Sequence, residues 1–230
     1  MLVHDLDTVA YDDAFALQKR TVRQVQESTG EETLYLLEHP HVITMGRNTT
    51  ANSLIAGKAL LDSRGVTLVD TDRGGDVTYH GPGQLVGYPI IELEAGRRDV
   101  RRYVSDVEEV LLKTLAEFSI EGRRDAVHRG VWVAERKIAS VGIRISRWVT
   151  SHGFALNVNT DLSYFSLIHP CGITGCEMAS MAGEIGQPVD MAAVKESFVR
   201  HFSQVFARRI ELVPCQSGGI GESREETRYG

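Results

Sequence analysis

Apolar residues recur at helical spacing in three stretches of this chain, and each stretch predicts a helix. The first covers residues 12–26, where Phe15, Val22 and Val25 lie near one face and Asp12 is a candidate N-cap. The second and third cover residues 100–118 and 190–206, and each carries an apolar stripe along one side. Such stripes are more typical of helix faces that pack on a core than of a cofactor-binding surface.

Short apolar runs between these helices predict β-strands. The runs lie at residues 33–37, 42–45, 66–69, 85–91, 130–133, 138–145 and 153–158. They come in clusters between well-separated helices and do not alternate strictly with them. This order favours an α+β fold, in which helices flank a mixed β-sheet.

The length and charge of the chain narrow its class. With 230 residues, one large domain is expected at residues 1–216, and the Gly-rich, charged stretch 217–230 is expected to be a disordered tail. The formal net charge of −6 argues against a general nucleic-acid binder. Neither a basic leader nor an apolar run of about 20 residues is present, and three cysteines make no disulfide framework. We therefore expect a cytoplasmic protein that does not engage membranes.

One glycine-rich stretch, residues 72–84 (DRGGDVTYHGPGQ), has a composition that suits binding. Its glycines permit close approach of backbone N–H groups to a ligand, and Arg73, Tyr79, His80 and Gln84 are able to orient polar groups. It lacks both the Gly-Lys-Ser/Thr ending of a P-loop and the glycine spacing of a dinucleotide fingerprint. A Gly-rich surface turn is the alternative interpretation.

Cys171 lies between a proline and a glycine, which is not the setting of a core strand. A free thiol has a pKa near 8.5, so only about 3% is thiolate at pH 7, and a cationic neighbour raises that fraction. Lys137 and His80 are both candidates for that neighbour, and the sequence alone places neither beside Cys171. The alternatives are a buried, inert cysteine and a solvated lysine at the start of a strand.

Four blocks together make the chain recognisable. They are residues 37–47 (LEHPHVITMGR), residues 73–84 (RGGDVTYHGPGQ), residues 136–142 (RKIASVG) with 152–157 (HGFALN), and residues 170–172 (PCG). On these blocks the chain resembles the lipoyl(octanoyl) transferase family. The resemblance implies a fold akin to that of the biotin and lipoate protein ligases, with a mixed sheet and flanking helices around an acyl pocket.

The resemblance also implies roles for individual residues. Cys171 matches the nucleophile that carries the acyl thioester, and Lys137 matches the lysine that lowers the pKa of this thiol. We further expect Gly75 and Gly153 to let backbone approach the ligand. The residues expected to bind substrate are Arg73, Gly74, Gly75, Asp76, Val77, Thr78, Tyr79, His80, Ser140, Val141, Gly142, Gly153, Phe154 and Ala155.

The implied reaction moves an octanoyl or lipoyl group from acyl carrier protein, through Cys171, to a lysine of another protein. The implied acceptors are the lipoyl domains of 2-oxoacid dehydrogenase complexes and the glycine cleavage H protein, and the reaction is the first step of endogenous protein lipoylation. It exchanges one thioester for another before the amide forms, so it requires no ATP, cofactor or metal.

Two other functions fit parts of the sequence. An ATP-dependent lipoate or biotin protein ligase would share the Arg-Gly-Gly block, but it would need ATP and magnesium and no nucleophilic cysteine. A non-catalytic zinc protein would use His169, Cys171 and Cys176. A structural zinc site usually takes four ligands, and the chain has no Cys-x-x-Cys pair.

Overall fold

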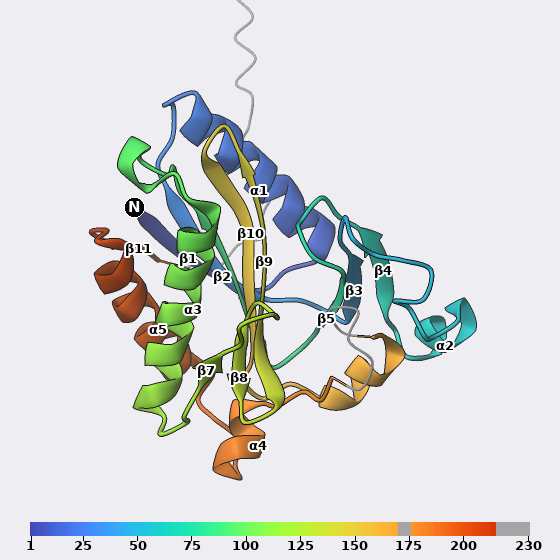
Figure 1. Cartoon of the computed structure of the whole chain (residues 1–230). Helices are drawn as coiled ribbons and strands as arrows, with labels where there is room; N and C mark the ends of the chain where they lie inside the picture. The colour runs from blue at the N-terminus through green and yellow to red at the C-terminus, as the bar shows by residue number, and fades with distance from the viewer. Residues whose placement is uncertain (170–175, 215–230) are drawn as a thin grey trace, which may run out of the picture.

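The computed structural model of the chain describes residues 1–169 and 176–214. Cys171, Cys215 and the expected tail at 217–230 therefore lie outside the described residues. The described part contains an eight-stranded sheet and a three-stranded sheet, together with helices on both faces of the larger one (Figure 1). Within the described residues, none of the helices is both long and apolar enough to cross a lipid bilayer.

The large sheet is mixed, as the sequence predicted. Its strands follow in the order β11 (Glu211–Val213), β1 (Leu2–Thr8), β2 (Thr33–Glu38), β6 (Gln84–Ile90), β10 (Val149–Asn157), β9 (Arg136–Ser146), β8 (Val131–Val133) and β7 (Arg123–Arg124). Strand β1 runs parallel to both β11 and β2, and the remaining pairs are antiparallel. The small sheet has the order β4 (Thr67–Asp70), β3 (Val42–Met45) and β5 (Val77–His80).

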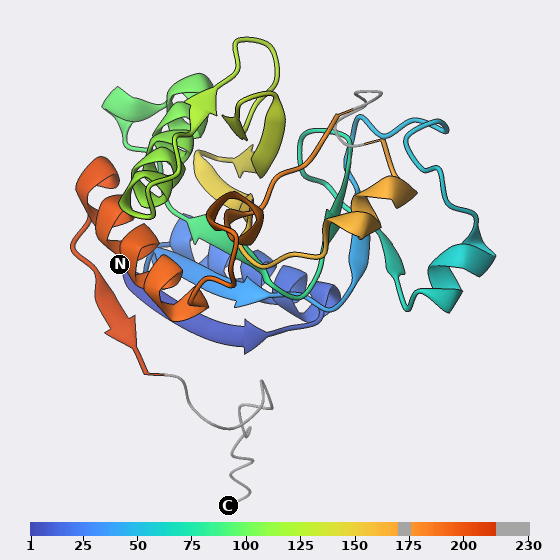
Figure 2. The same ribbon diagram turned by 90° about the horizontal axis from the view of Figure 1, so that it is seen from below.

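Helices cover both faces of the large sheet because its central strands are apolar on both sides. In β2, Leu34 and Leu36 face the core shared with α3 (Val100–Glu117) and α5 (Met191–Phe206), which pack side by side (Figure 2). The alternate residues Tyr35 and Leu37 face the opposite side, where they pack with α1 (Tyr11–Gln26). This alternation follows from the two-residue period of a strand.

The three main helices lie where the apolar stripes predicted them, with small differences at their ends. Helix α1 begins at Tyr11, and its N-cap is Ala10, so Asp12 is not the cap that we expected. Asp12 and Asp13 lie in the first turn, where a negative charge interacts favourably with the helix dipole. Asp190 caps α5 by accepting a hydrogen bond from the Ala192 backbone N–H.

The remaining helices are short. They are α2 (Lys58–Ser63), α4 (Met181–Ile185) and the 3₁₀ turns η1 (Ala95–Arg97) and η2 (Leu162–Leu167).

The small sheet brings the glycine-rich stretch to the large sheet. Val77 to His80 form β5 itself, so this stretch consists of a loop at 72–76, strand β5, and a turn at 81–83 that leads into β6. The Gly74 N–H donates to the Ile143 carbonyl of β9 over 2.9 Å and ties the loop to that strand. Gly75 has a φ of 89°, a backbone conformation that glycine adopts without strain.

Candidate active site

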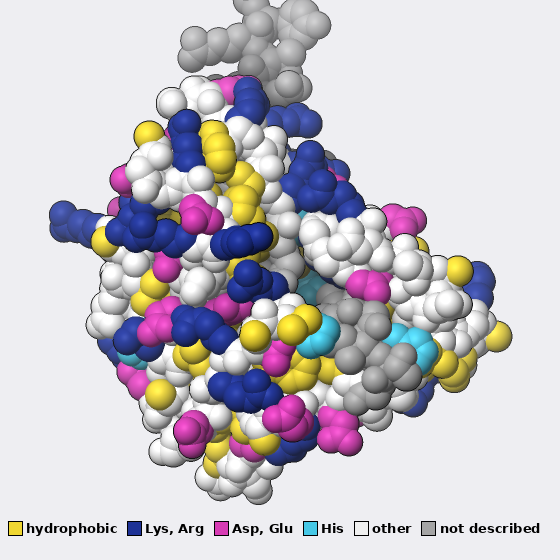
Figure 3. Space-filling view, in the orientation of Figure 1, with side chains coloured by type: hydrophobic (Ala, Val, Ile, Leu, Met, Phe, Trp, Pro, Cys, Tyr) yellow, Lys and Arg dark blue, Asp and Glu magenta, His cyan; other side chains and the backbone are white. Residues whose placement is uncertain are grey.

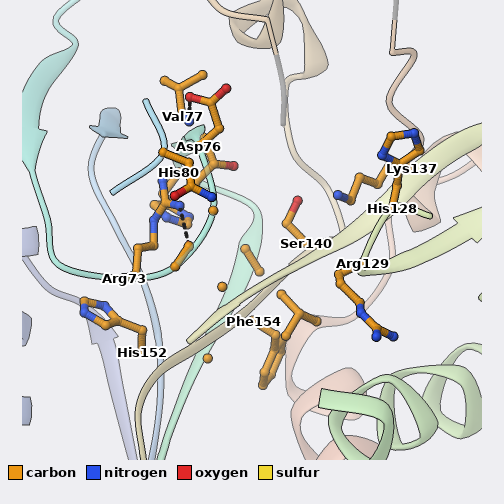
Figure 4. A pocket seen from close by; sticks show the side chains of 18 of the residues that line it. Arg73, Asp76, Val77, His80, His128, Arg129, Lys137, Ser140, His152 and Phe154 are labelled. Carbon is orange, nitrogen blue, oxygen red and sulfur yellow. Dashed lines mark hydrogen bonds between the residues drawn. The ribbon is translucent and has the colours of Figure 1, made fainter. Parts of the chain in front are cut away.

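A cavity of about 310 Å³ lies between β9, β10, the 72–76 loop with β5, and the start of α1. We call it the main cavity. It is lined by Tyr11, Asn48, Arg73, Gly74, Gly75, Asp76, Val77, Thr78, His80, Tyr88, Val127, His128, Arg129, Lys137, Ser140, Val141, Gly142, His152, Gly153, Phe154 and Ala155. Figure 4 shows Lys137, His128 and Arg129 on one side of it and Arg73, His80 and His152 on the other.

The main cavity gathers segments that the sequence analysis singled out separately. Lys137 lines it together with thirteen of the fourteen residues expected to bind substrate. Tyr79 is the exception among the described residues of that set. Its side chain packs in the apolar cluster of the small sheet, where its hydroxyl hydrogen bonds His41 Nδ1 over 2.8 Å. Cys171 lies outside the described residues, so the structure gives no position for it.

Lys137 is buried, with 2% of its surface exposed, at one end of the main cavity. Its ammonium nitrogen lies 5.5 Å from the centre of the Trp132 ring, and its Cε packs closely over Gly130. The backbone fixes this position, because the Lys137 N–H donates to Glu177 O and its carbonyl accepts from Ala179 N–H, both over 2.9 Å. The segment that follows Cys176 therefore runs beside Lys137.

Arg73 is buried against β3 at the glycine-rich side of the cavity. Its Nη2 donates to the Thr44 carbonyl over 2.7 Å and to Thr44 Oγ1 over 2.9 Å, and its Nε donates to the same hydroxyl over 3.2 Å. These bonds hold the guanidinium in one orientation. A cation held in this way can stabilise negative charge on a bound ligand, and its side chain does not have to change orientation first.

A chain of buried hydrogen bonds joins His80 to Ala179, whose N–H donates to the Lys137 carbonyl. His80 Nδ1 bonds Gln84 Oε1 over 2.8 Å, Gln84 Nε2 donates to Asn157 Oδ1 over 2.9 Å, and Asn157 Nδ2 donates to Ala179 O over 2.9 Å. Because Gln84 presents its oxygen, His80 carries its proton on Nδ1. Burial, with His39 nearby, lowers the pKa of His80 to about 3, so its ring is neutral at pH 7.

His152 lies at the opposite end of the main cavity from Lys137. Its Nε2 bonds Asp72 Oδ1 over 2.8 Å, and the other Asp72 oxygen accepts from Arg144. Burial, followed by the charges of Arg73 and Arg144, lowers the pKa of His152 to about 3. His152 also has a φ of 55°, which is uncommon for a residue other than glycine.

Gly153 lines the main cavity and also lies tightly against a neighbouring strand. A Cβ atom at this position would lie 2.1 Å from the carbonyl oxygen of Gly87 on the neighbouring strand β6. The close approach of Gly87 is therefore by itself a reason for glycine at this position. For Gly75 the positive φ alone explains the glycine, since the nearest atom to an added Cβ is the tip of Arg73 at 3.5 Å.

The residue set from the sequence missed several cavity-lining residues. Tyr11 starts a helix, Tyr88 lies in an all-buried strand, and Asn48 follows a strand, so no local pattern marks them. His152 directly precedes residues 153–155, which were expected to bind substrate. A polar residue within an apolar strand was the feature of the sequence that could have pointed to it. The loop from Val127 to Arg129 carried no motif; Val127 is 78% exposed there.

The surroundings of the main cavity are basic although the whole chain is acidic. Lys and Arg side chains gather over α1 and beside the β9–β10 hairpin (Figure 3). Lys19 and Arg47 are exposed and lie near enough to His152 to contribute to lowering its pKa. In the described ranges no three His, Cys, Asp or Glu side chains group as they would to hold a metal ion.

Comparison with known proteins identifies relatives along most of the chain. Residues 10–203 match the family described as the lipoyl protein ligase A/B catalytic domain. An octanoyltransferase of Solibacter usitatus is 48% identical over 94% of this chain and 96% of its own length. An octanoyltransferase of Syntrophotalea carbinolica is 46% identical over 92% of this chain and 97% of its own length.

Solved structures share the fold at low sequence identity. A lipoate-protein ligase A bound with ATP superposes with a TM-score of 0.74 and 15% identity, covering 94% of this chain and 90% of that one. A biotin protein ligase of Aquifex aeolicus, in complex with biotin and ATP, gives a TM-score of 0.53 and 12% identity over 89% of this chain and 70% of that one. The expected fold class is thus confirmed.

Proposed function

This chain belongs to the lipoyl protein ligase A/B catalytic domain family, and from that membership we propose that it is an octanoyltransferase with a cysteine nucleophile. It takes an octanoyl or lipoyl group from acyl carrier protein onto Cys171 and passes it to a lysine of a lipoyl domain. The acceptors are the lipoyl domains of 2-oxoacid dehydrogenase complexes and the glycine cleavage H protein. The reaction begins endogenous protein lipoylation.

The observation that carries this proposal is the convergence of distant segments on the main cavity. Residues from the 73–80, 137–142 and 153–155 segments line one cavity, with an apolar wall of Val141, Phe154 and Ala155 suited to a hydrocarbon chain. Lys137 pairs with Met178, seven residues after Cys171, in an isolated parallel bridge. This short connection supports a site in which Cys171 works next to Lys137.

In the first transfer, the Cys171 thiolate attacks the carbonyl carbon of the donor thioester. The new bond joins Cys171 Sγ to the acyl carbon, and the bond between that carbon and the carrier's sulfur breaks. The carrier's sulfur leaves as a thiolate, which then takes up a proton from water. The buried Lys137 ammonium favours the Cys171 thiolate electrostatically, which is the role we propose for the Cys171–Lys137 pair.

In the second transfer, the neutral amine of the acceptor lysine attacks the acyl carbon on Cys171. A C–N bond forms, the C–S bond breaks, and the amine proton passes to the departing sulfur. The product is an amide, which is far more stable than the thioester, so the sequence of two steps needs no ATP. The basic surroundings of the main cavity suit an acidic carrier protein as donor.

The experiment that tests this function compares two donors in one assay. Purified protein is given a lipoyl domain and either octanoyl-acyl carrier protein without nucleotide, or free octanoate with ATP and magnesium. We expect amide formation with the first donor and none with the second. The reverse result would assign the chain to the ATP-dependent ligases, whose fold it shares.

A further inference from the structure

His152 combines four features that together single it out among the residues lining the main cavity. It is 98% buried, since 2% of its surface is exposed, and it lines the main cavity. Its backbone has a positive φ, a conformation that costs energy for a residue other than glycine and that clusters at functional sites. Its Nδ1 is buried without a hydrogen-bond partner among the described residues. Its Nε2 is held by the carboxylate of Asp72.

These contacts decide the protonation of the ring. The Asp72 carboxylate accepts only, so the proton of the neutral imidazole lies on Nε2 and a lone pair lies on Nδ1. The ion pair between Asp72 and Arg144 fixes the carboxylate in turn. The ring is also held from the sides, with its centre 5.3 Å from that of Phe15 and 6.5 Å from that of Tyr88.

The backbone of His152 is held as firmly as the ring. The His152 N–H donates to Gln18 Oε1 of α1 over 2.8 Å, and Gln18 itself is buried. A side chain fixed through both its ring and its backbone does not swing aside for a ligand at low cost. His152 is therefore a rigid wall of the main cavity.

The position of this wall is set by the register of the two central strands. His152 of β10 pairs with Ile143 of β9, and Lys137 lies six residues earlier on β9. At about 3.4 Å per residue, the two positions are roughly 20 Å apart along the strand. Their side chains line opposite ends of the main cavity, which is also lined by residues 140–142 of the intervening part of β9.

We propose that His152, held by Asp72 and Arg144, closes the distal end of the main cavity and sets the longest acyl chain that the protein accepts. This inference rests on the proposed function, in which the acyl carbonyl reacts at the Lys137 end. A saturated chain that is too long meets a fixed imidazole. It either breaks the bond to Asp72 or keeps its carbonyl short of the reacting sulfur.

The polar chemistry of the His152 ring disfavours a longer acyl chain in addition to the steric effect of its shape. A methyl group offers no proton to the Nδ1 lone pair, so a longer chain pressed against the ring buries an acceptor with no donor, which is unfavourable. Specificity then comes from a penalty on the wrong substrate, in addition to good contacts with the right one.

The test measures single-turnover acylation of Cys171 by intact-mass spectrometry, with acyl carrier protein loaded with octanoyl, decanoyl or dodecanoyl groups. The variants are His152→Gly, which tolerates the positive φ and removes the ring, and His152→Asn, which tolerates it and keeps a smaller polar group. Val141→Ala is the matched control, because it shortens an apolar side chain in the middle of the cavity.

In wild type we expect acylation by octanoyl to exceed that by decanoyl and dodecanoyl. In His152→Gly the decanoyl-to-octanoyl rate ratio should rise by at least about tenfold, since one or two methylenes in a pocket are commonly worth that much. His152→Asn should give a smaller rise, and Val141→Ala should change all three rates together. Melting curves of each variant verify that it is folded.

An unchanged ratio in folded His152→Gly that still forms an octanoyl adduct would overturn the inference and leave the proposed function intact. If wild type forms no adduct with any of the three donors, the proposed function itself fails. The two failures are therefore distinguishable in the same experiment.

Discussion

Replacing Lys137 by methionine separates its charge from its packing. The lysine stem runs over Gly130 and beside the Trp132 ring, and methionine fills similar space without a charge. Lys137→Arg is a poorer test, because there is little space around this side chain. The Lys137 Cε packs so closely over Gly130 that a Cβ built on Gly130 would lie 2.7 Å from it. A planar guanidinium would overpack this spot. Melting curves of both proteins verify that Lys137→Met is folded.

The expected effect on Cys171 has two opposing parts. If Lys137 brings the thiol pKa from about 8.5 to about 7, the thiolate fraction at pH 7 rises from about 3% to about one half, roughly 16-fold. The intrinsic nucleophilicity of the thiolate falls with its pKa, by roughly fivefold for this shift. The net gain from the charge is thus only about threefold at neutral pH, and above about pH 8 the Lys137→Met thiol should react faster than that of wild type.

The assay is the rate of Cys171 alkylation by iodoacetamide between about pH 6 and about pH 10, in a background where Cys176 and Cys215 are alanine. We expect the wild-type and Lys137→Met profiles to cross near pH 8. Parallel profiles with the same thiol pKa would refute the electrostatic role of Lys137. A loss of acyl transfer far larger than about threefold at pH 7 would show that Lys137 also moves a proton or positions the substrate.

Three further predictions follow from particular contacts. Gly153→Val should lower both the melting temperature and the activity, because the Cβ of the valine would overlap the Gly87 carbonyl oxygen. A variant that loses activity but keeps the wild-type melting temperature would contradict this prediction. Cys176→Ala should retain full acyl transfer. Burial lowers the pKa of His39 to about 4, and the pKa values of His80 and His152 to about 3. The unfolded state then binds more protons below about pH 6.5, so the free energy of unfolding in urea should fall by about 1 kcal/mol per pH unit for each histidine as pH drops toward 4, and less steeply in His39→Gln.

The parts of the fold that the sequence predicted are those with a clear period. The stripes of α3 and α5 gave both helices to within a residue or so at each end. Strand β1 was missed because its polar residues, among them His4, Asp5 and Asp7, hide the apolar alternation. Strand β5 was missed because Val77 to His80 were considered as part of a glycine-rich loop.

The candidate site was predictable in its segments but not in its arrangement. A motif marks residues by composition, so it includes Tyr79, whose side chain faces the small-sheet core, along with neighbours that line the main cavity. The set of residues expected to bind substrate omits Tyr88 and His152, which reach the cavity only through strand register and a positive φ. These are tertiary properties that no short stretch of sequence encodes.

The measurement that tests the central claim most directly is the mapping of the acyl adduct. The protein is incubated with octanoyl-acyl carrier protein in the absence of ATP and of any acceptor, and its peptides are analysed by mass spectrometry before and after hydroxylamine. We predict one octanoyl group on Cys171, removed by hydroxylamine as a thioester, and lost on addition of a lipoyl domain that gains the same group on a lysine. A Cys171→Ala protein that transfers octanoyl at the wild-type rate would contradict the account.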